Sequence, residues 1–127
     1  MGASSERFVD HFGLILTPQQ VLEATGWSTD DLAQAAEQGR VLRVYATDRT
    51  FGYWSRGLTG TRPRIPIRGI EDALRAWAFA DVDPWTIASW MSTEQIELKG
   101  RTPRAALLDG DVALVVTLAR QTAARLS

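Results

Sequence analysis

A repeated pattern of helix starts and stops constrains the fold of this chain more than any other feature of its sequence. Thr17-Pro18 and Thr102-Pro103 each place a capping side chain before a proline. This order favours a helix start, because the cap accepts from a free backbone amide and proline fits the first helical position. Gly26, Gly39 and Gly110 follow helical segments, and glycine readily adopts the left-handed conformation that ends a helix. The sequence therefore predicts several short helices.

The amino-terminal half combines two such helices with a pair of strands. One helix is expected from Pro18 to Thr25 and a second from a start at Ser28 or Thr29 to an end at Gly39, with a glycine turn between them. Two short helices with a tight connection have a helix-turn-helix shape. The period then changes to β-branched and aromatic runs over 41–45 and 51–54, around a turn at 48–50, which is typical of a hairpin. We expect this hairpin to lie as a wing beside the helices.

A change in composition divides the rest of the chain. Residues 57–69 are rich in glycine, proline and arginine and lack a sustained apolar period. The helical period returns over 70–81. Further helices are predicted to begin at Pro84 and Pro103, and Asp111 is predicted to cap a last helix. We therefore expect a mainly α chain with a small β-hairpin, in the α+β class. Its predicted parts are a flexible leader over 1–15, the helix-turn-helix with its wing over 16–56, a linker over 57–69 and a compact helical domain over 70–127.

Composition argues against catalysis. The chain has no cysteine and a single histidine, His11, whereas hydrolytic triads, zinc sites and histidine-based proton transfer need such residues to converge. Acidic pairs at 30–31, 71–72, 81/83 and 109/111 fall at predicted helix ends, where capping is favoured over acid–base work. We therefore expect no enzymatic activity, no metal and no cofactor. The sequence has no signal-peptide pattern and no apolar run of membrane-span length, so we expect a cytoplasmic protein.

Charge is distributed unevenly along the chain. Residues 1–39 carry one arginine against six acidic residues, whereas 40–68, the basic island, carry seven arginines against Asp48 alone. Arginines on a wing can contact phosphates or enter the minor groove, and glutamines on the second helix can contact adenine edges. Against DNA binding, that helix has three acidic residues and no basic one, and the island could instead pair with the acidic segments beside it. The candidate nucleic-acid-binding residues are Gln34, Gln38, Arg40, Arg43, Arg49 and Arg56.

Three stretches of the last third form a recognisable pattern: 83–90 with two tryptophans, 97–111 with Leu-Lys-Gly-Arg-Thr-Pro, and 115–120. They resemble the toxin-binding domain of Xre/MbcA/ParS-type antitoxins. In that family a tryptophan-bearing helix precedes a Leu-x-Gly-x-Thr-Pro turn, a short helix and a final helix. The positions that match are Trp90, Leu98, Gly100, Thr102, Pro103, Leu107, Gly110 and Leu118.

The resemblance implies a partner as well as a fold. Members of that family bind a RES-domain toxin that degrades NAD, and their terminal residues help to occlude its active site. The partner-binding candidates that follow for this chain are Trp90, Arg101, Arg104, Arg120, Arg125, Leu126 and Ser127.

Two hypotheses about function follow. The leading one is an antitoxin-like protein that neutralises a cognate RES-type toxin through 84–127, with transcriptional repression through 17–56 as an additional role. The alternative is a stand-alone winged helix-turn-helix regulator whose carboxy-terminal helices serve dimerisation. We expect a homodimer, since half-site recognition and tryptophan-rich helical modules both favour one.

Overall fold

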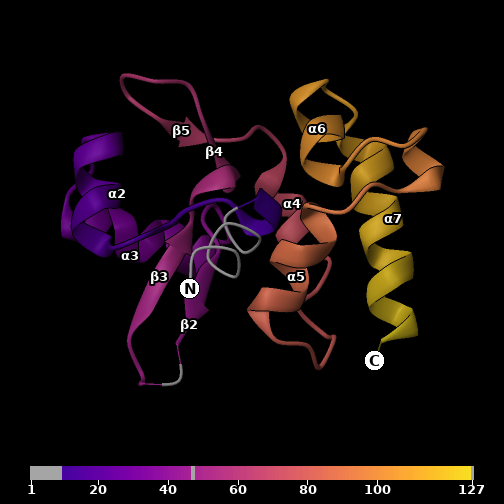
Figure 1. Ribbon diagram of the computed structural model, residues 1–127, viewed down its shortest axis with the longest axis horizontal. Helices are drawn as coiled ribbons and strands as arrows, with labels where there is room; N and C mark the ends of the chain where they lie inside the picture. Colours follow the sequence, from indigo (N-terminus) through magenta and orange to yellow (C-terminus); the bar gives the residue numbers. More distant parts are fainter. Residues whose placement is uncertain (1–9, 47, 127) are drawn as a thin grey trace.

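The computed structural model describes residues 10–46 and 48–126. Its helices are α2 (Pro18–Thr25), α3 (Thr29–Gln38), α4 (Ile70–Arg75), α5 (Pro84–Met91), α6 (Pro103–Leu108) and α7 (Val112–Arg125). Its strands are β1 (Ile15–Leu16), β2 (Arg43–Tyr45), β3 (Phe51–Trp54), β4 (Leu58–Thr59) and β5 (Ile65–Pro66). The structure is mainly helical with two small antiparallel sheets, which confirms the α+β class. In Figure 1, β2 and β3 lie between α2 and α3 on one side and α4 to α7 on the other.

Local capping explains the helix boundaries. The Thr17 hydroxyl accepts from an amide of the first turn of α2 at 3.2 Å, and Ser28 and Asp31 form a reciprocal capping box at α3. Thr102 caps α6 in the same way at 3.1 Å. The glycines that follow α2 and α3 both have a φ of 78°. These helix starts and stops confirm the sequence-based predictions.

The cap predicted at Asp111 is wrong. Asp111 occupies the N-cap position of α7 but makes no capping hydrogen bond. Its carboxylate instead accepts from Arg101 Nη1 at 2.7 Å, and the same nitrogen donates to Asp109 at 3.0 Å. A charge-assisted bond to a guanidinium is stronger than a bond to a neutral amide, so the ion pair takes the carboxylate.

The three-stranded sheet has the order β1-β3-β2, and both of its pairs are antiparallel. The sequence predicts a flexible leader over 1–15, but Ile15 pairs with β3. Gly52 makes room for this strand, because a Cβ there would lie 2.5 Å from Ile15 Cγ2. His11 Nε2 also lies 2.9 Å from Ser89 Oγ on α5. The described part of the leader, from residue 10 onward, is therefore packed against the rest of the chain.

The segment predicted as a linker, 57–69, holds a second hairpin. β4 and β5 pair antiparallel, and Leu58 and Ile67 are buried. Strands of two residues are too short to produce an alternating pattern, so the periodicity of the sequence does not indicate them.

One apolar core runs across the predicted linker. It joins the sheet to the carboxy-terminal helices, and its buried members include Val44, Trp54, Ile67, Ile70, Met91, Leu107 and Leu118. Two polar contacts cross the same boundary: Trp85 Nε1 donates to Tyr45 O at 2.9 Å, and Arg104 Nε donates to Arg56 O at 2.8 Å. A smaller core lies between the sheet and α2–α3, with Val21, Leu32, Ala35 and Tyr53 among its members.

Candidate functional site

The first candidate site lies where α3 meets the β2–β3 hairpin. Side chains alternate along a strand, so Arg43 and Tyr45 of β2 point to the same face. A hollow of about 350 Å³ separates them from Ala33, Ala36 and Glu37 of α3. We call this site the α3–hairpin surface and define it by Asp30, Ala33, Gln34, Glu37, Gln38, Arg43, Tyr45, Arg49 and Phe51.

Arg43 is held in place on this surface. Its Nε and Nη2 donate to the Tyr53 hydroxyl oxygen at 3.2 and 3.0 Å, and its guanidinium carbon lies 4.7 Å from the Phe51 ring centroid. Stacking on an aromatic face is favourable for a cation and restricts the side chain. Arg43 is therefore a preformed positive charge beside α3.

Arg49 lies at the exposed turn of the hairpin. Its φ of 71° is uncommon for a residue other than glycine. The preceding Asp48 carboxylate accepts from both the hydroxyl and the amide of Thr50. These bonds, the hydroxyl bond first, lower the pKa of Asp48. The turn is thus shaped by Asp48 and Thr50, while the Arg49 side chain stays exposed.

Two of the nominated arginines make their contacts within the fold. Arg56 Nη1 and Nη2 donate to the carbonyl oxygens of His11 and Asp10 at 3.1 and 3.2 Å. Arg40 lies with its guanidinium carbon 5.7 Å from the Trp27 ring centroid. The Nε of Arg40 is buried and has no hydrogen-bond partner among the residues that the structure describes. Arg40 and Arg56 therefore contribute more to packing within the fold than to the exposed surface of the site.

Six arginines of the basic island form no ion pair with any described carboxylate. The ion pairs that the described ranges contain all lie in the carboxy-terminal helices and their loops. Arg64 instead donates to the carbonyl oxygens of Ser55 and Leu58 at 3.3 and 3.1 Å. Direct ion pairs within the described residues therefore do not account for these six, which are Arg40, Arg43, Arg49, Arg62, Arg64 and Arg68.

The exposed face of α3 combines amide and carboxylate side chains. Asp30, Gln34 and Glu37 follow one another at helical spacing and are all exposed. Asp31 is engaged in the cap, where its carboxylate accepts from the Ser28 amide at 3.0 Å. That backbone bond, followed by the bond to the Ser28 hydroxyl, lowers the pKa of Asp31. The face therefore offers hydrogen-bonding groups and no positive charge of its own.

The residues that carry the antitoxin resemblance build a compact turn before α7. Gly100 and Gly110 have φ values of 82° and 90°, and Thr102 caps α6 as described above. The remaining matched side chains between the short helix η2 (Ile96–Leu98) and α7 are buried: Leu98, Pro103, Leu107 and Leu118. All of these residues maintain the fold of this turn, and the fold would need them whichever partner binds.

Three of the residues expected to contact a partner are engaged within the chain. Arg101 forms the ion pairs described above. Arg104 is partly buried, and this burial, ahead of the neighbouring positive charges, lowers its pKa. Trp90 packs edge-on against Trp77 with ring centroids 5.4 Å apart. Arg120, Arg125 and Leu126 are exposed on α7 and at its end, and Ser127 lies outside the described residues.

A second candidate site, the α4–α7 groove, is not predicted by the sequence analysis. Two hollows of about 440 and 520 Å³ lie between these helices and share Asp72 and Arg120. Phe79 lines one of them and is 96% exposed. Phe79 lies off the apolar stripe that begins at Ile70. This position is the sequence signal that could have indicated an exposed aromatic side chain at the groove. The groove is defined by Asp72, Arg75, Phe79, Val112, Val116 and Arg120.

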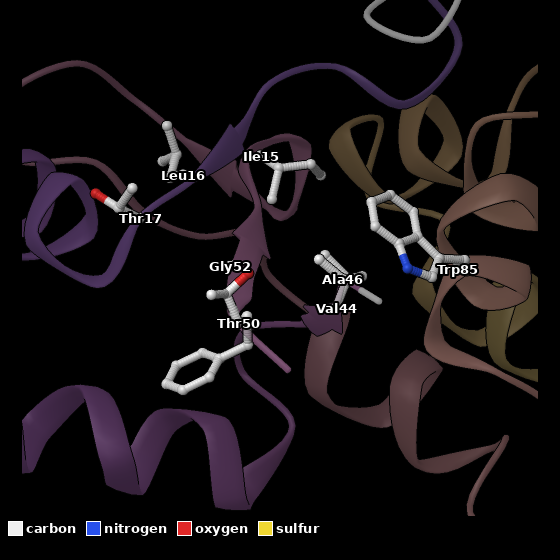
Figure 2. Close-up of a pocket in the computed structure, with 9 residues that line it drawn as sticks. Ile15, Leu16, Thr17, Val44, Ala46, Thr50, Gly52 and Trp85 are labelled. Carbon is white, nitrogen blue, oxygen red and sulfur yellow. The ribbon is translucent and has the colours of Figure 1, made fainter. Parts of the chain in front are cut away.

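An apolar pocket of about 270 Å³ lies between the sheet and α5. Figure 2 shows Trp85 on one side of it, opposite Val44 and Ala46, with Ile15 from β1 nearby. Most of the described residues that line the pocket are apolar, and none of those residues has a titratable side chain.

Neither of the usual signs of a metal or membrane protein is present in the described parts of the chain. No three His, Cys, Asp or Glu side chains among residues 10–46 and 48–126 lie close enough together to hold a metal ion. Within the same ranges, no helix has the length and apolar character needed to cross a bilayer.

Comparison with known proteins gives a likeness of fold. No family model matches the chain, and no curated protein matches it in sequence. The NMR structure of Rv2175c is similar, with a TM-score of 0.67 over 87% of this chain and 81% of that chain. The two sequences are 17% identical, so the likeness concerns the fold alone.

Proposed function

We propose that this chain is a winged helix-turn-helix protein that binds double-stranded DNA, with α3 as the recognition helix and the β2–β3 hairpin as the wing. The observation that carries the proposal is the chain order β1-α2-α3-β2-β3 combined with the sheet order β1-β3-β2. In this arrangement the hairpin follows the second helix directly and lies beside it. A recognition helix can then enter the major groove while the hairpin reaches the neighbouring backbone or minor groove.

The exposed side chains suit these two roles. Gln34 and Gln38 are exposed on α3, and a glutamine amide can bond adenine N6 and N7 in the major groove. Arg49 at the hairpin turn and Arg43 at its base supply the positive charge that phosphates attract. In this proposal, side chains of α3 contact the bases and arginines of the hairpin contact the phosphates.

The acidic side chains of α3 make a further prediction about specificity. Asp30 and Glu37 share the exposed face with Gln34, so they repel phosphates and weaken non-specific binding. A carboxylate can accept from the cytosine N4 amino group. We therefore expect weak binding to random DNA and a clear preference for sites that place cytosine opposite these residues.

The test is fluorescence anisotropy of a labelled fragment of the protein's own promoter, titrated between 50 and ~300 mM salt, the range over which phosphate contacts are lost. Arg49→Ala should reduce the slope of log K against log salt by about 0.9, the value for one phosphate contact. Arg125→Ala is the matched control, because it removes an exposed arginine from the end of α7. Absence of binding by the wild type at 50 mM salt, or equal losses in the two variants, would contradict the proposal.

A second candidate function is neutralisation of a RES-type toxin by the carboxy-terminal helices, as the antitoxin resemblance implies. It is favoured by one observation: the turn that carries the resemblance leaves Ile96 93% exposed. At the end of α7, Arg125 and Leu126 are also exposed. Exposed apolar side chains beside a rigid turn suit a protein interface, in which such residues act as anchors.

Co-expression with a toxic RES-domain protein encoded next to this chain tests the second candidate. The double variant Arg125→Ala, Leu126→Ala should lose protection while keeping the circular dichroism spectrum of the wild type. Truncation after Leu118 is a poorer test, because it removes Ala119 and Ala123, which are buried against Trp77. Full protection by the double variant would contradict occlusion of the toxin by the end of α7.

A further inference from the structure

The α4–α7 groove presents an apolar anchor that this chain does not bury. Phe79 is 96% exposed, although it lies beside a hollow formed by α4 and α7. The floor of the groove is apolar as well, since Val112 and Val116 line its second hollow. A fully exposed phenylalanine beside an apolar hollow is typical of an interface, in which an aromatic anchor fills a pocket of the partner.

The charges of the groove indicate what kind of partner it fits. Arg75 is engaged by Glu71 at 3.0 Å. Asp72 and Arg120 both line the two hollows, and neither forms an ion pair with another described residue. The groove therefore carries one unused charge of each sign. A nucleic acid would favour a uniformly positive surface, and the Asp72 carboxylate opposes it.

A surface with one aromatic anchor, an adjoining groove and one unpaired charge of each sign is complementary to itself. In a two-fold interface the same patch meets on both subunits, so each contact occurs twice. We propose that the α4–α7 groove is the interface of a homodimer, in which Phe79 of each copy enters the groove of the other and Asp72 faces the Arg120 of the other copy. The interface uses a surface separate from the α3–hairpin surface and does not depend on DNA binding.

Sedimentation velocity at about 1 to 100 μM, without DNA, measures the association; this range brackets the affinity of a weak to moderate dimer. The wild type should be dimeric at the upper end. Phe79→Ser should raise the dissociation constant by about 100-fold or more, since both anchors are lost together. Its fold should be unchanged because Phe79 is almost fully exposed. The matched control is Leu14→Ser, which removes an apolar side chain that is 60% exposed and lies outside the groove; it should dimerise like the wild type.

Charge reversal tests the geometry of the proposed contact. Asp72→Arg and Arg120→Asp should each be monomeric, because each places like charges opposite one another across the interface. An equimolar mixture of these two variants should dimerise, since every copy then meets an opposite charge on the other. Within each variant, positions 72 and 120 carry the same charge whether or not the other variant is present. Association that is restored in the mixture therefore reports the contact between copies and not a change within one copy.

Three outcomes would overturn the proposal. The first is a wild type that remains monomeric at 100 μM. This outcome includes the case in which the groove binds a different protein and not a second copy of the chain. The second is dimerisation that Leu14→Ser abolishes and Phe79→Ser does not. The third is a mixture of the charge variants that stays monomeric. Loss of DNA binding in the anisotropy experiment would leave all of these measurements unaffected, so the two proposals can fail separately.

Discussion

Gly69 occupies a position that no other residue can fill without cost. Its φ is 86°, and a Cβ at this position would lie 2.5 Å from Cγ1 and 2.6 Å from Cγ2 of Val112. The residue thus meets two demands at once: a left-handed backbone and close contact between the start of α4 and the start of α7. The fit of α4 against α7, and hence the shape of the groove between them, depends on this absence of a side chain.

Gly69→Ala should therefore lower the free energy of unfolding by more than about 2 kcal/mol, the sum of backbone strain and a core clash. Gly110→Ala is the matched comparison, because Gly110 has a φ of 90° and open space around the position of a Cβ. It should cost about 1 kcal/mol from strain alone. Urea unfolding of both variants checks the difference, and equal losses would show that the contact with Val112 is unimportant.

Side-chain roles that depend on distant residues could not be predicted from the sequence. Thr17 and Thr102 cap as predicted, because a cap involves residues three positions apart. Arg101 and Arg104 were nominated for a partner, but they bond to Asp111 and to the carbonyl of residue 56. These contacts follow from the packing of helices against the sheet, and no local pattern encodes them.

At the scale of elements, the helices and strands that could be predicted are those with a clear local sequence pattern at their ends or along their length. Helices α2 to α7 have caps, prolines or glycines at their ends, and the β2–β3 hairpin has a run of apolar and aromatic residues around a polar turn. β1, β4 and β5 have two residues each, and strands of this length are specified by their neighbours. The α4–α7 groove was missed for the same reason, since it exists only once two helices are packed.

The start of the last two helices gives a prediction at this scale. Thr102→Ala should lower the free energy of unfolding by about 1 kcal/mol, because it removes a cap. Asp111→Asn should cost less than about 1 kcal/mol, since Asp111 contributes an exposed ion pair and no cap. In 0.5 M NaCl, roughly three times physiological ionic strength, the loss from Asp111→Asn should nearly vanish and that from Thr102→Ala should persist. A loss from Asp111→Asn that salt does not change would contradict this assignment.

At the scale of the whole molecule, the shared core links the proposed DNA-binding elements to the carboxy-terminal helices. Val44 and Trp54 of the sheet belong to the same buried cluster as Met91 and Leu118. The Trp85 indole N–H bond to the Tyr45 carbonyl joins α5 to the end of β2 at 2.9 Å. The sheet and the carboxy-terminal helices are therefore packed around one continuous core.

This continuity predicts a single cooperative unfolding transition. Tryptophan fluorescence, which reports mainly on the helices and the sheet core, and far-ultraviolet circular dichroism should give the same midpoint in urea, as expected for a two-state domain. Two separated transitions would instead indicate that residues 57–69 act as a linker between independent domains.

The central claim, that α3 and the β2–β3 hairpin contact DNA, is tested most directly by an amide-resolved NMR titration with a promoter duplex at low salt. We predict that chemical-shift changes concentrate at 30–38 and 43–51 and that α7 and the α4–α7 groove change little. Shift changes confined to α7 and the groove, or no changes at all with excess duplex, would contradict the claim.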